Sequence, residues 1–304
     1  MNDLLDRIIH SVSDILLGKE HAIKLSLACL LSRGHLLIED LPGVGKTTLA
    51  HALAHLLGLN YQRIQFTSDL LPSDVTGISI YERNSGEFRF HPGPVFSQVL
   101  LADEINRATP KAQSALLEAM EERQVTVEGK SHDLPEPFFV IATQNPGHQV
   151  GTYPLPESQL DRFLMRISLG FPDAAAERSL LKGEDRRTLL NRVQPIIKPE
   201  HLQQLQQHAA KVHASDAILD YCQALLSHTR SSDQFLHGLS PRAGLSMLRA
   251  ARSWALINGR NIVLPEDIQT VLPSVTAHRL QGIDSHGTDG EVLARQLINS
   301  VPIP

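Results

Sequence analysis

Hydrophobic residues in the first half of the chain follow two alternating patterns, short continuous runs and longer stretches with helical spacing. The short runs fall at 35–39, 99–102, 138–142 and 165–169, and Tyr61–Gln65 is expected to be a further strand. Helical spacing occurs between them at 48–57 and again from Pro110 onward. Continuous apolar runs are typical of strands buried on both faces, and alternation with helices is typical of a parallel sheet. The pattern predicts an α/β fold in which helices cover both faces of a five-stranded parallel sheet.

Two β-hairpins are expected in addition to this alternation. Apolar and polar residues alternate at 78–81 and at 87–90, on either side of Asn84-Ser85-Gly86. A second alternating segment, 124–127, precedes a turn at Gly129. Period-two alternation beside a glycine-containing turn predicts a hairpin. Because each hairpin interrupts the strand–helix order, we expect both to face a partner or a pore.

Both ends of the chain are predicted to be helical. Residues 4–16 and 20–32 carry apolar side chains at helical spacing. From 174 onward the pattern is almost wholly helical. Within this region Ser240 is a predicted helix cap, and Pro241 stands in the first turn of that helix, where proline is favoured.

The chain has 304 residues, enough for about two domains. We therefore predict an αβα core at 1–172 and a small all-α domain at 173–304. Hydrophobic residues make up 42% and charged residues 20%, as in an ordinary soluble protein. The formal net charge of −5 argues against a duplex-binding surface, because non-specific nucleic-acid affinity depends on neutralising phosphates.

The sequence also indicates the cellular compartment in which the protein is expected to lie. The two cysteines, Cys29 and Cys222, lie in apolar helical patterns and are expected to be buried thiols. No apolar run approaches the ~20 residues of a membrane span. The N-terminus has no apolar core of the kind that a signal peptide needs. We therefore expect a cytoplasmic protein.

The strongest chemical signal is a predicted phosphate-binding loop between the first strand and the following helix. The residues expected to bind the nucleotide are Pro42, Gly43, Val44, Gly45, Lys46, Thr47 and Thr48. The glycines allow backbone N–H groups to approach a polyphosphate, and the helix N-terminus adds roughly half a positive charge. Lys46 would reach the β- and γ-phosphates, and the Thr47 hydroxyl would bind Mg²⁺. The usual first glycine of the motif is Asp40 here.

Polar residues follow two later strands at the sheet edge where ligands bind in open α/β folds. Asp103 and Glu104 follow the apolar run 99–102, and Asn145 follows the run 138–142. Asp103 would hold Mg²⁺, mostly through water. Glu104 would orient the attacking water or accept its proton. Asn145 would hold that water or sense the γ-phosphate.

Three weaker signals have alternative interpretations. The turn at Gly18 precedes the loop by about one helix, so it could contact the adenine or be an ordinary helix–helix turn. Arg242 stands in the first turn of a helix, where a cation is unfavourable unless an anion lies nearby. His51 and His55 are four residues apart, but the zinc-protease glutamate is absent between them, which favours packing over metal binding.

The chain resembles the MoxR branch of the AAA+ ATPases over nearly its whole length. The matching stretches, in order, are EDLPGVGKT at 39–47, LADEINRA at 101–108, QSALLEAMEE at 113–122, ATQNP at 142–146, LPE at 155–157, LDRF at 160–163 and SPRA at 240–243. Asp40 in place of the first glycine looks usual for this branch.

The resemblance implies that 1–172 is a P-loop NTPase core and 173–304 a helical lid domain, with nucleotide bound between them. It implies ATP and Mg²⁺ as cofactors and an active site shared between neighbouring subunits of a ring, most often a hexamer. It implies that Asn145 is the sensor 1 residue, Arg162 the arginine finger and Arg242 the sensor 2 residue. Arg107 is a rival for the finger because it also follows the carboxylates. The two hairpins match the helix-2 insert and the pre-sensor hairpin of this branch.

By the same resemblance, the function is ATP-driven remodelling or activation of partner proteins, often ones with a von Willebrand factor A domain. Such a partner would be a separate chain. The alternatives are the ATPase subunit of a metal-insertion complex of the chelatase kind, and a motor acting on nucleic acid. A nucleotide-locked scaffold without turnover is disfavoured, because both Asp103 and Glu104 are present.

Overall fold

The computed structural model of the chain describes residues 2–84, 86–145, 151–183, 186–283 and 289–303. Pro146 and Ser85, which belong to the matched stretch at 142–146 and to the first predicted hairpin turn, lie outside the described residues. A five-stranded parallel sheet forms the centre of the N-terminal half. Its strands, in spatial order, are β2 (Tyr61–Gln65), β5 (Val99–Asp103), β8 (Phe139–Gln144), β1 (Leu36–Glu39) and β9 (Met165–Ile167). The predicted sheet is therefore confirmed.

Both faces of the sheet are buried at its central strands β1, β5 and β8, as the continuous apolar runs predicted, whereas the edge strand β2 exposes Gln62, Arg63 and Gln65. In β1, Leu36 and Ile38 pack into one hydrophobic cluster while Leu37 packs into another on the opposite face. The first cluster includes α1 (Asn2–Ile15), α2 (Glu20–Leu31) and α3 (Lys46–Leu56), and the second includes α5 (Pro110–Glu122). Alternate strand residues point to opposite faces, so the three buried positions of β1 are all apolar, and the polar Glu39 stands at its end.

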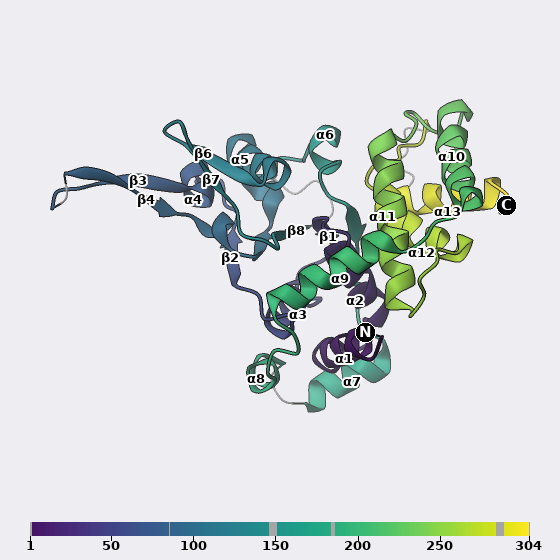
Figure 1. The fold of residues 1–304 in the computed structure, drawn as a ribbon, viewed down its shortest axis with the longest axis horizontal. Coiled ribbons are helices and arrows are strands. Elements are labelled where there is room, and N and C mark those ends of the chain that lie inside the picture. Colours follow the sequence, from purple (N-terminus) through teal and green to yellow (C-terminus); the bar gives the residue numbers. More distant parts are fainter. Residues whose placement is uncertain (1, 85, 146–150, 184–185, 284–288, 304) are drawn as a thin grey trace.

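Both predicted hairpins are present. The first pairs β3 (Gly77–Glu82) with β4 (Glu87–Pro92), and the second pairs β6 (Gln124–Val127) with β7 (Lys130–Asp133). The β3–β4 hairpin follows the short helix α4 (Pro72–Thr76) and projects from the body as a long arm (Figure 1). Gly77 has φ 97° and lies against the backbone of Pro92 and Gly93, so a side chain there would collide with the base of the arm.

The C-terminal half is helical across the residues that the structure describes. Its helices are α7 (Ala174–Lys182), α8 (Arg186–Arg192), α9 (Pro199–Lys211), α10 (Asp216–Ser231), α11 (Pro241–Ile257), α12 (Pro265–Thr276) and α13 (Gly290–Ser300). Helix α11 begins as predicted, because the Ser240 hydroxyl accepts the N–H of Ala243 at 3.2 Å. Helices α8 to α13 share one buried cluster with α1 and α2, so the two halves of the chain pack as one body.

Two boundaries differ from the sequence prediction for identifiable reasons. Helix α3 begins at Lys46 rather than at 48, because Gly45 adopts the left-handed conformation that ends the loop. Strand β9 ends at Ile167 rather than at 169, because the Asp40 carboxylate accepts the N–H groups of Leu169 and Gly170. Polar contacts from the phosphate loop therefore decide where the last strand stops.

Two further expectations from the sequence concern the cysteines and membrane-spanning helices. Cys29 and Cys222 are buried free thiols, and burial raises the pKa of both, that of Cys222 to about 11. Within the described ranges, no helix has the length and apolar character needed to cross a bilayer.

Candidate functional site

The predicted phosphate loop forms the floor of a hollow at the carboxyl edge of the sheet. Gly43 has φ 85° and Gly45 φ 103°, both in the left-handed region that favours glycine. The hollow has a volume of about 280 Å³ and is lined by Pro42, Gly43, Gly45, Lys46, Thr47, Thr48, Asp103, Glu104 and Asn145. The sheet therefore brings together residues from β1, β5 and β8 that are far apart in sequence, with the N-terminus of α3 behind them.

Lys46 is folded back over the loop. Its Nζ donates to the main-chain oxygens of Asp40 (2.5 Å) and Leu41 (3.2 Å) and to Asn145 Oδ1 (3.1 Å). Burial lowers the pKa of the Lys46 ammonium, and the charges of Asp40, Asp103 and Glu104 offset part of that effect. Three neutral acceptors thus hold a largely buried cation, and phosphate oxygens would replace them with charged ones.

Asp103 ends β5 with both carboxylate oxygens occupied. Oδ1 accepts the Thr143 hydroxyl at 2.6 Å, and Oδ2 accepts Arg63 through Nη2 (2.6 Å) and Nε (3.2 Å). Sequence analysis missed Arg63 and Thr143. Thr143 stands in the matched stretch at 142–146, but Arg63 is apparent only once β2 is known to lie beside β5.

Glu104 is held from three directions. Oε1 accepts Asn145 Nδ2 at 3.1 Å, and Oε2 accepts Gln65 Nε2 and Arg107 Nη1, each at 2.9 Å. Its backbone is left-handed, with φ 55°, and its N–H donates to the Thr143 hydroxyl. Strained backbone in a non-glycine residue concentrates at functional sites, and here it aims the carboxylate into the hollow.

Arg107, the rival for the arginine finger, is thereby placed beside the carboxylate of its own subunit. Its ion pair with Glu104 spans three residues of the same chain, and its side chain is more than half exposed. The predicted sensor Asn145 contacts both Lys46 and Glu104, so it links the phosphate loop to the carboxylate pair.

Asp40, which replaces the usual first glycine of the motif, joins the loop to the segment after β9. Oδ1 accepts the N–H of Leu41 (2.7 Å), while Oδ2 accepts the N–H groups of Leu169 and Gly170 (both 2.6 Å) and the Ser168 hydroxyl (2.9 Å). Burial raises the pKa of this carboxyl, but the four hydrogen bonds together lower it by more, so its pKa lies below the ordinary value. Asp40, where the motif usually has glycine, therefore has a structural role, since it joins the loop to the segment after β9.

Two residues predicted to bind the nucleotide do not line the hollow. The side chain of Val44 is buried in the core. Gly18 has φ 69° and faces Ala176 and Asp173 at the start of α7, which supports the ordinary helix–helix turn among its two interpretations. Its place in a nucleotide site stays a prediction.

Packing also accounts for the helical histidine pair. The His51 ring stacks on Tyr61, and His55 Nε2 lies 2.5 Å from the main-chain oxygen of Val193. Across the described ranges, no group of three or more His, Cys, Asp or Glu residues is arranged to hold a metal ion.

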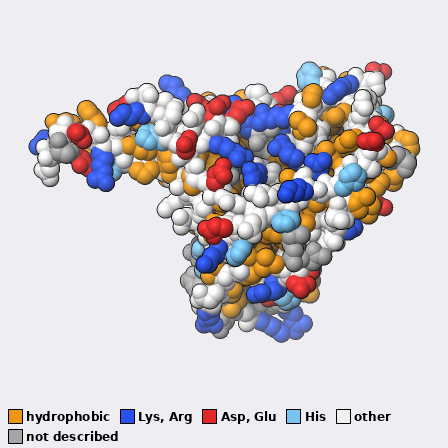
Figure 2. Space-filling model, in the orientation of Figure 1, with side chains coloured by type: hydrophobic (Ala, Val, Ile, Leu, Met, Phe, Trp, Pro, Cys, Tyr) orange, Lys and Arg blue, Asp and Glu red, His pale blue; other side chains and the backbone are white. Residues whose placement is uncertain are grey.

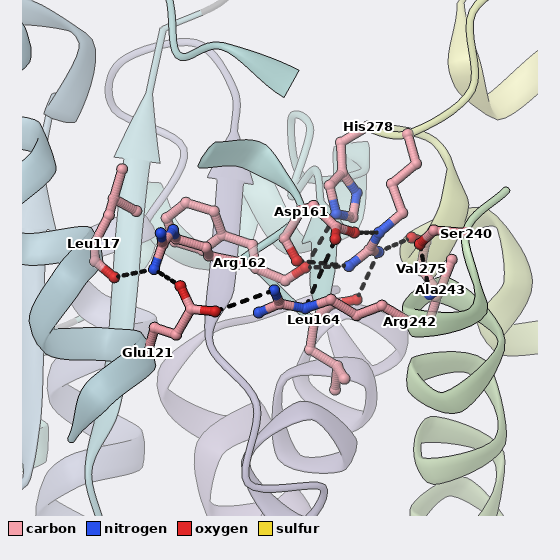
Figure 3. Close-up of polar contacts among 12 residues, drawn as sticks. Leu117, Glu121, Asp161, Arg162, Leu164, Ser240, Arg242, Ala243, Val275 and His278 are labelled. Carbon is pink, nitrogen blue, oxygen red and sulfur yellow. Dashed lines mark hydrogen bonds and ion pairs between the residues drawn. The ribbon is translucent and has the colours of Figure 1, made fainter. Parts of the chain in front are cut away.

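Arg162 and Arg242 form a separate polar cluster with Glu121 and Asp161 (Figure 3). Arg162 contacts the Glu121 carboxylate and donates to the main-chain oxygen of Leu117 at 3.0 Å. Arg242 lies 3.5 Å from Glu121 and 3.6 Å from Asp161. The anion that a first-turn arginine requires is therefore supplied within the chain.

The buried Arg279, which sequence analysis missed, fixes Asp161 in this cluster. It donates to Asp161 Oδ1 at 2.6 Å and also to the main-chain oxygens of Phe163 and Leu164.

This arginine cluster lies at the opposite edge of the sheet from the phosphate loop. Arg162 precedes β9, and the N–H of Leu164 donates to the main-chain oxygen of His35, just before β1 begins. Asp40 stands five positions after His35, which at about 3.3 Å per residue is roughly 16 Å along the strand. The structure thus groups Lys46, Thr47, Asp103, Glu104 and Asn145 at one edge and Arg162 with Arg242 at the other.

The hollow fits a nucleotide polyphosphate and Mg²⁺. Backbone at two left-handed glycines, a buried lysine and a helix N-terminus favour an anion, and Thr47 and Asp103 provide oxygen ligands suited to Mg²⁺. When bound, the metal would neutralise charge on the phosphates.

Comparison with known proteins gives the same assignment. Residues 35–165 match the model of the ATPase family associated with various cellular activities (AAA), and residues 227–298 match the AAA lid domain. The chain is 43% identical to the YeaC protein of Bacillus subtilis, covering 100% of this chain and 96% of that protein. It is 42% identical to the chaperone MoxR1 of Mycobacterium tuberculosis (91% and 75% covered) and 34% identical to the MoxR protein of Paracoccus denitrificans (97% and 94%).

A crystal structure gives the same result for the fold. A candidate ATPase from Cytophaga hutchinsonii matches with a TM-score of 0.90 and 36% identity, over 100% of this chain and 96% of that one. The matched relatives extend across the sheet, the lid and both residue clusters, so the chain belongs to the MoxR family of AAA+ ATPases.

Proposed function

We propose that the protein hydrolyses ATP in a ring of identical subunits and uses the energy to remodel or activate partner proteins. The observation that carries the proposal is the division of the charged machinery between two edges of one sheet. The phosphate loop and carboxylate pair lie at the carboxyl edge, and Arg162 and Arg242 lie at the amino edge. A cation at one edge is too far from a phosphate bound at the other, which supports a site that a second subunit completes.

Within one subunit, each residue of the hollow has a role that its contacts support. Lys46 and the loop N–H groups bind the phosphates, and Thr47 and Asp103 hold the metal ion. Glu104 orients the attacking water, since its carboxylate is fixed by Gln65, Arg107 and Asn145 but faces the hollow.

Arg162 and Arg242 act on the nucleotide of the neighbouring subunit. Both guanidinium groups are partly exposed, at 28% and 46%, and both stand at a surface that a neighbour can cover. Negative charge grows on the transferred phosphoryl group, and an arginine provided by a neighbour stabilises it. By family resemblance the ring is a hexamer.

The β3–β4 arm is the proposed contact for partner proteins. It exposes Tyr81 (53%) and Phe88 (65%), whose rings lie 5.4 Å apart, together with Ile78 and Ile80. An exposed apolar surface on a projecting hairpin is typical of an interaction site rather than a core. The family resemblance points to a separate chain with a von Willebrand factor A domain as that partner.

We further propose that residues 1–172 act as the ATPase core and 173–304 as the lid. Asp173 caps α7 by accepting the N–H of Ala176 at 2.7 Å, so the helical region begins at the proposed boundary.

ATP hydrolysis measured against protein concentration tests the proposal, with the assembly state followed by native mass spectrometry. Turnover per subunit should rise over the concentration range in which rings form. Lys46→Ala is the control, since it should neither bind nor hydrolyse ATP. Full turnover by isolated monomers would contradict a shared site, and assembled rings that lack turnover with ATP and Mg²⁺ would contradict the ATPase assignment.

A further inference from the structure

A second basic hollow lies between α2, α9 and α11. It has a volume of about 510 Å³ and is lined by Leu31, Ser32, Arg33, Arg123, Gln206, Gln207, Ala209, Ala210, Lys211, Arg249, Arg252 and Ser253. We call it the arginine groove, defined by its five cations Arg33, Arg123, Lys211, Arg249 and Arg252. Figure 2 shows Lys and Arg side chains gathered on this face, between α5 and α11 as labelled in Figure 1.

The five cations have no acidic partners in the part of the chain that the structure describes. Among the described residues, none that lines the groove is Asp or Glu, and no ion pair involves any of the five. Arg252 Nε is buried and finds no hydrogen-bond partner in the described part of the chain. Burial lowers the pKa of the Arg249 guanidinium, and the positive charges of Arg242 and Arg123 lower it further. Unbalanced charge of this kind is costly unless an anion joins it.

The backbone conformation of two of these arginines also indicates an anion site. Arg33 (φ 53°) and Arg123 (φ 54°) are both left-handed, at the ends of α2 and α5, where glycine would fit without strain. Among the described residues two other non-glycine residues share this conformation, and one of them is Glu104. A cation placed in the last turn of either helix would interact with the helix dipole equally well, and its backbone would not be strained. The strained backbone at Arg33 and Arg123 therefore indicates that the placement of these two side chains serves a function.

The shape and chemistry of the groove favour a compact anion. A volume of several hundred cubic ångströms suits a small molecule. Guanidinium groups bind phosphate oxygens in bidentate fashion, and four of the five cations are arginines. Leu31, Ala209 and Ala210 give one wall an apolar surface for an uncharged portion of the ligand.

We infer that the arginine groove is a second ligand site, which binds a small molecule carrying a polyphosphate group. It is separate from the phosphate loop, because Arg33 precedes β1 whereas the loop follows it. It adjoins the Arg162–Arg242 cluster, since Arg33, Arg123 and Arg249 also line the hollow around that cluster. A bound anion would relieve the repulsion among these arginines, so binding should also raise the melting temperature.

The experiment uses the full chain with Lys46→Ala, which disables the phosphate loop, and inorganic tripolyphosphate as the probe. Calorimetry should show one saturable site per subunit. Adding Arg123→Gly and Arg249→Gln should weaken this binding at least about tenfold, as expected when two charge-assisted contacts are lost. The Arg123→Gly change should leave the melting temperature equal or higher, because glycine removes the backbone strain.

A matched control removes two positive charges elsewhere. Arg178→Gln and Lys182→Gln, both exposed on α7, should leave tripolyphosphate affinity within about twofold, since exposed charges at a distance are screened by salt. Equal affinity in the groove variant and the control would overturn the inference, as would the absence of saturable binding to Lys46→Ala. Groove-dependent binding of an acidic peptide without any binding of tripolyphosphate would overturn it in favour of a protein partner. Neither result depends on ATP hydrolysis, so this test and that of the proposed function fail independently.

Discussion

Arg162 and Arg242 contact the same carboxylate, that of Glu121, although one precedes β9 and the other lies in the first turn of α11. One acid at the end of α5 thus holds two guanidinium groups side by side at the amino edge of the sheet (Figure 3). The shared acid also means that removing either arginine leaves Glu121 with a partner. Single substitutions at these positions should therefore change activity without unfolding the protein.

Arg162→Ala should bind ATP normally, because the phosphate loop is intact, and should hydrolyse it poorly. An arginine supplied by a neighbour is worth roughly 10³-fold or more in rate. Mixed with Lys46→Ala, itself inactive, it should recover part of the turnover, because some interfaces then pair an intact loop with an intact arginine. Steady-state ATP hydrolysis across mixing ratios is the measurement.

Absence of recovery in mixed rings, with mixing verified by native mass spectrometry, would rule out a role for Arg162 on the neighbouring nucleotide. Arg107→Ala is the informative companion. If Arg107 only positions Glu104 of its own chain, no mixture with Lys46→Ala should restore activity to the Arg107→Ala active sites.

Glu104→Gln should retain ATP binding and slow turnover at least roughly a hundredfold, because the group that orients or deprotonates water is lost. Single-turnover hydrolysis separates the chemical step from nucleotide release. Glu122→Gln removes a comparable charge from an exposed position at the end of α5 and should leave turnover unchanged. Near-normal turnover in Glu104→Gln would assign the role to another residue.

Tyr81→Ser with Phe88→Ser should leave thermal stability and basal ATP hydrolysis close to wild type, because both rings are exposed on the arm. Co-purification of a von Willebrand factor A domain partner should fall. Leu181→Ser, which removes an apolar side chain that is 85% exposed on α7, is the matched control and should leave the partner bound. A large drop in melting temperature for the arm variant would show that the rings stabilise the fold instead.

His35 should make stability depend on pH. Its ring is buried, accepting the N–H of Val140 at 3.0 Å, and burial lowers its pKa from 6.5 to about 4. The folded ring therefore stays neutral while the unfolded chain takes up a proton below pH 6.5. This contribution is complete above pH 6.5 and is lost as the pH falls toward 4, by about 3 kcal/mol in total.

Urea unfolding at several pH values measures this effect. The stability advantage of wild type over His35→Gln should shrink between pH 6.5 and 4, because glutamine supplies a donor and an acceptor without titrating. His237→Gln, at an exposed position, should show no such trend relative to wild type. Parallel curves for wild type and His35→Gln would contradict the pH dependence assigned to His35.

Asp40→Gly, which restores the usual motif residue, should destabilise the protein by about 2 kcal/mol or more, because the N–H groups of Leu169 and Gly170 lose their acceptor. Thermal unfolding measures the loss. Asp40→Asn keeps one acceptor oxygen and should be affected less. A glycine variant as stable as wild type would show that water replaces the carboxylate without cost.

Local sequence predicted the parts of the site that follow single strands. Lys46, Asp103, Glu104 and Asn145 each stand at a strand end or loop that the apolar pattern marks, so their meeting at one edge follows from a parallel sheet. Arg63 was not predictable in this way, because its contact with Asp103 depends on the spatial order of the strands.

The same limit applies at the opposite edge. The buried Arg279 and the shared acid Glu121 come from elements with unrelated local patterns, and their packing depends on tertiary structure. The cations of the arginine groove likewise lie just after α2 and α5 and within α9 and α11, which no spacing rule connects.

The Asp40 contacts join the phosphate loop to the segment that leads into the C-terminal helices. One carboxylate fixes Leu41 of the loop and residues 168–170 to each other, so these two segments move as a single piece. The chain stays anchored beyond them, because Lys19 Nζ donates to the main-chain oxygen of Phe171 at 2.6 Å. A displacement of the loop by nucleotide would therefore reach the residues just before α7 through one side chain.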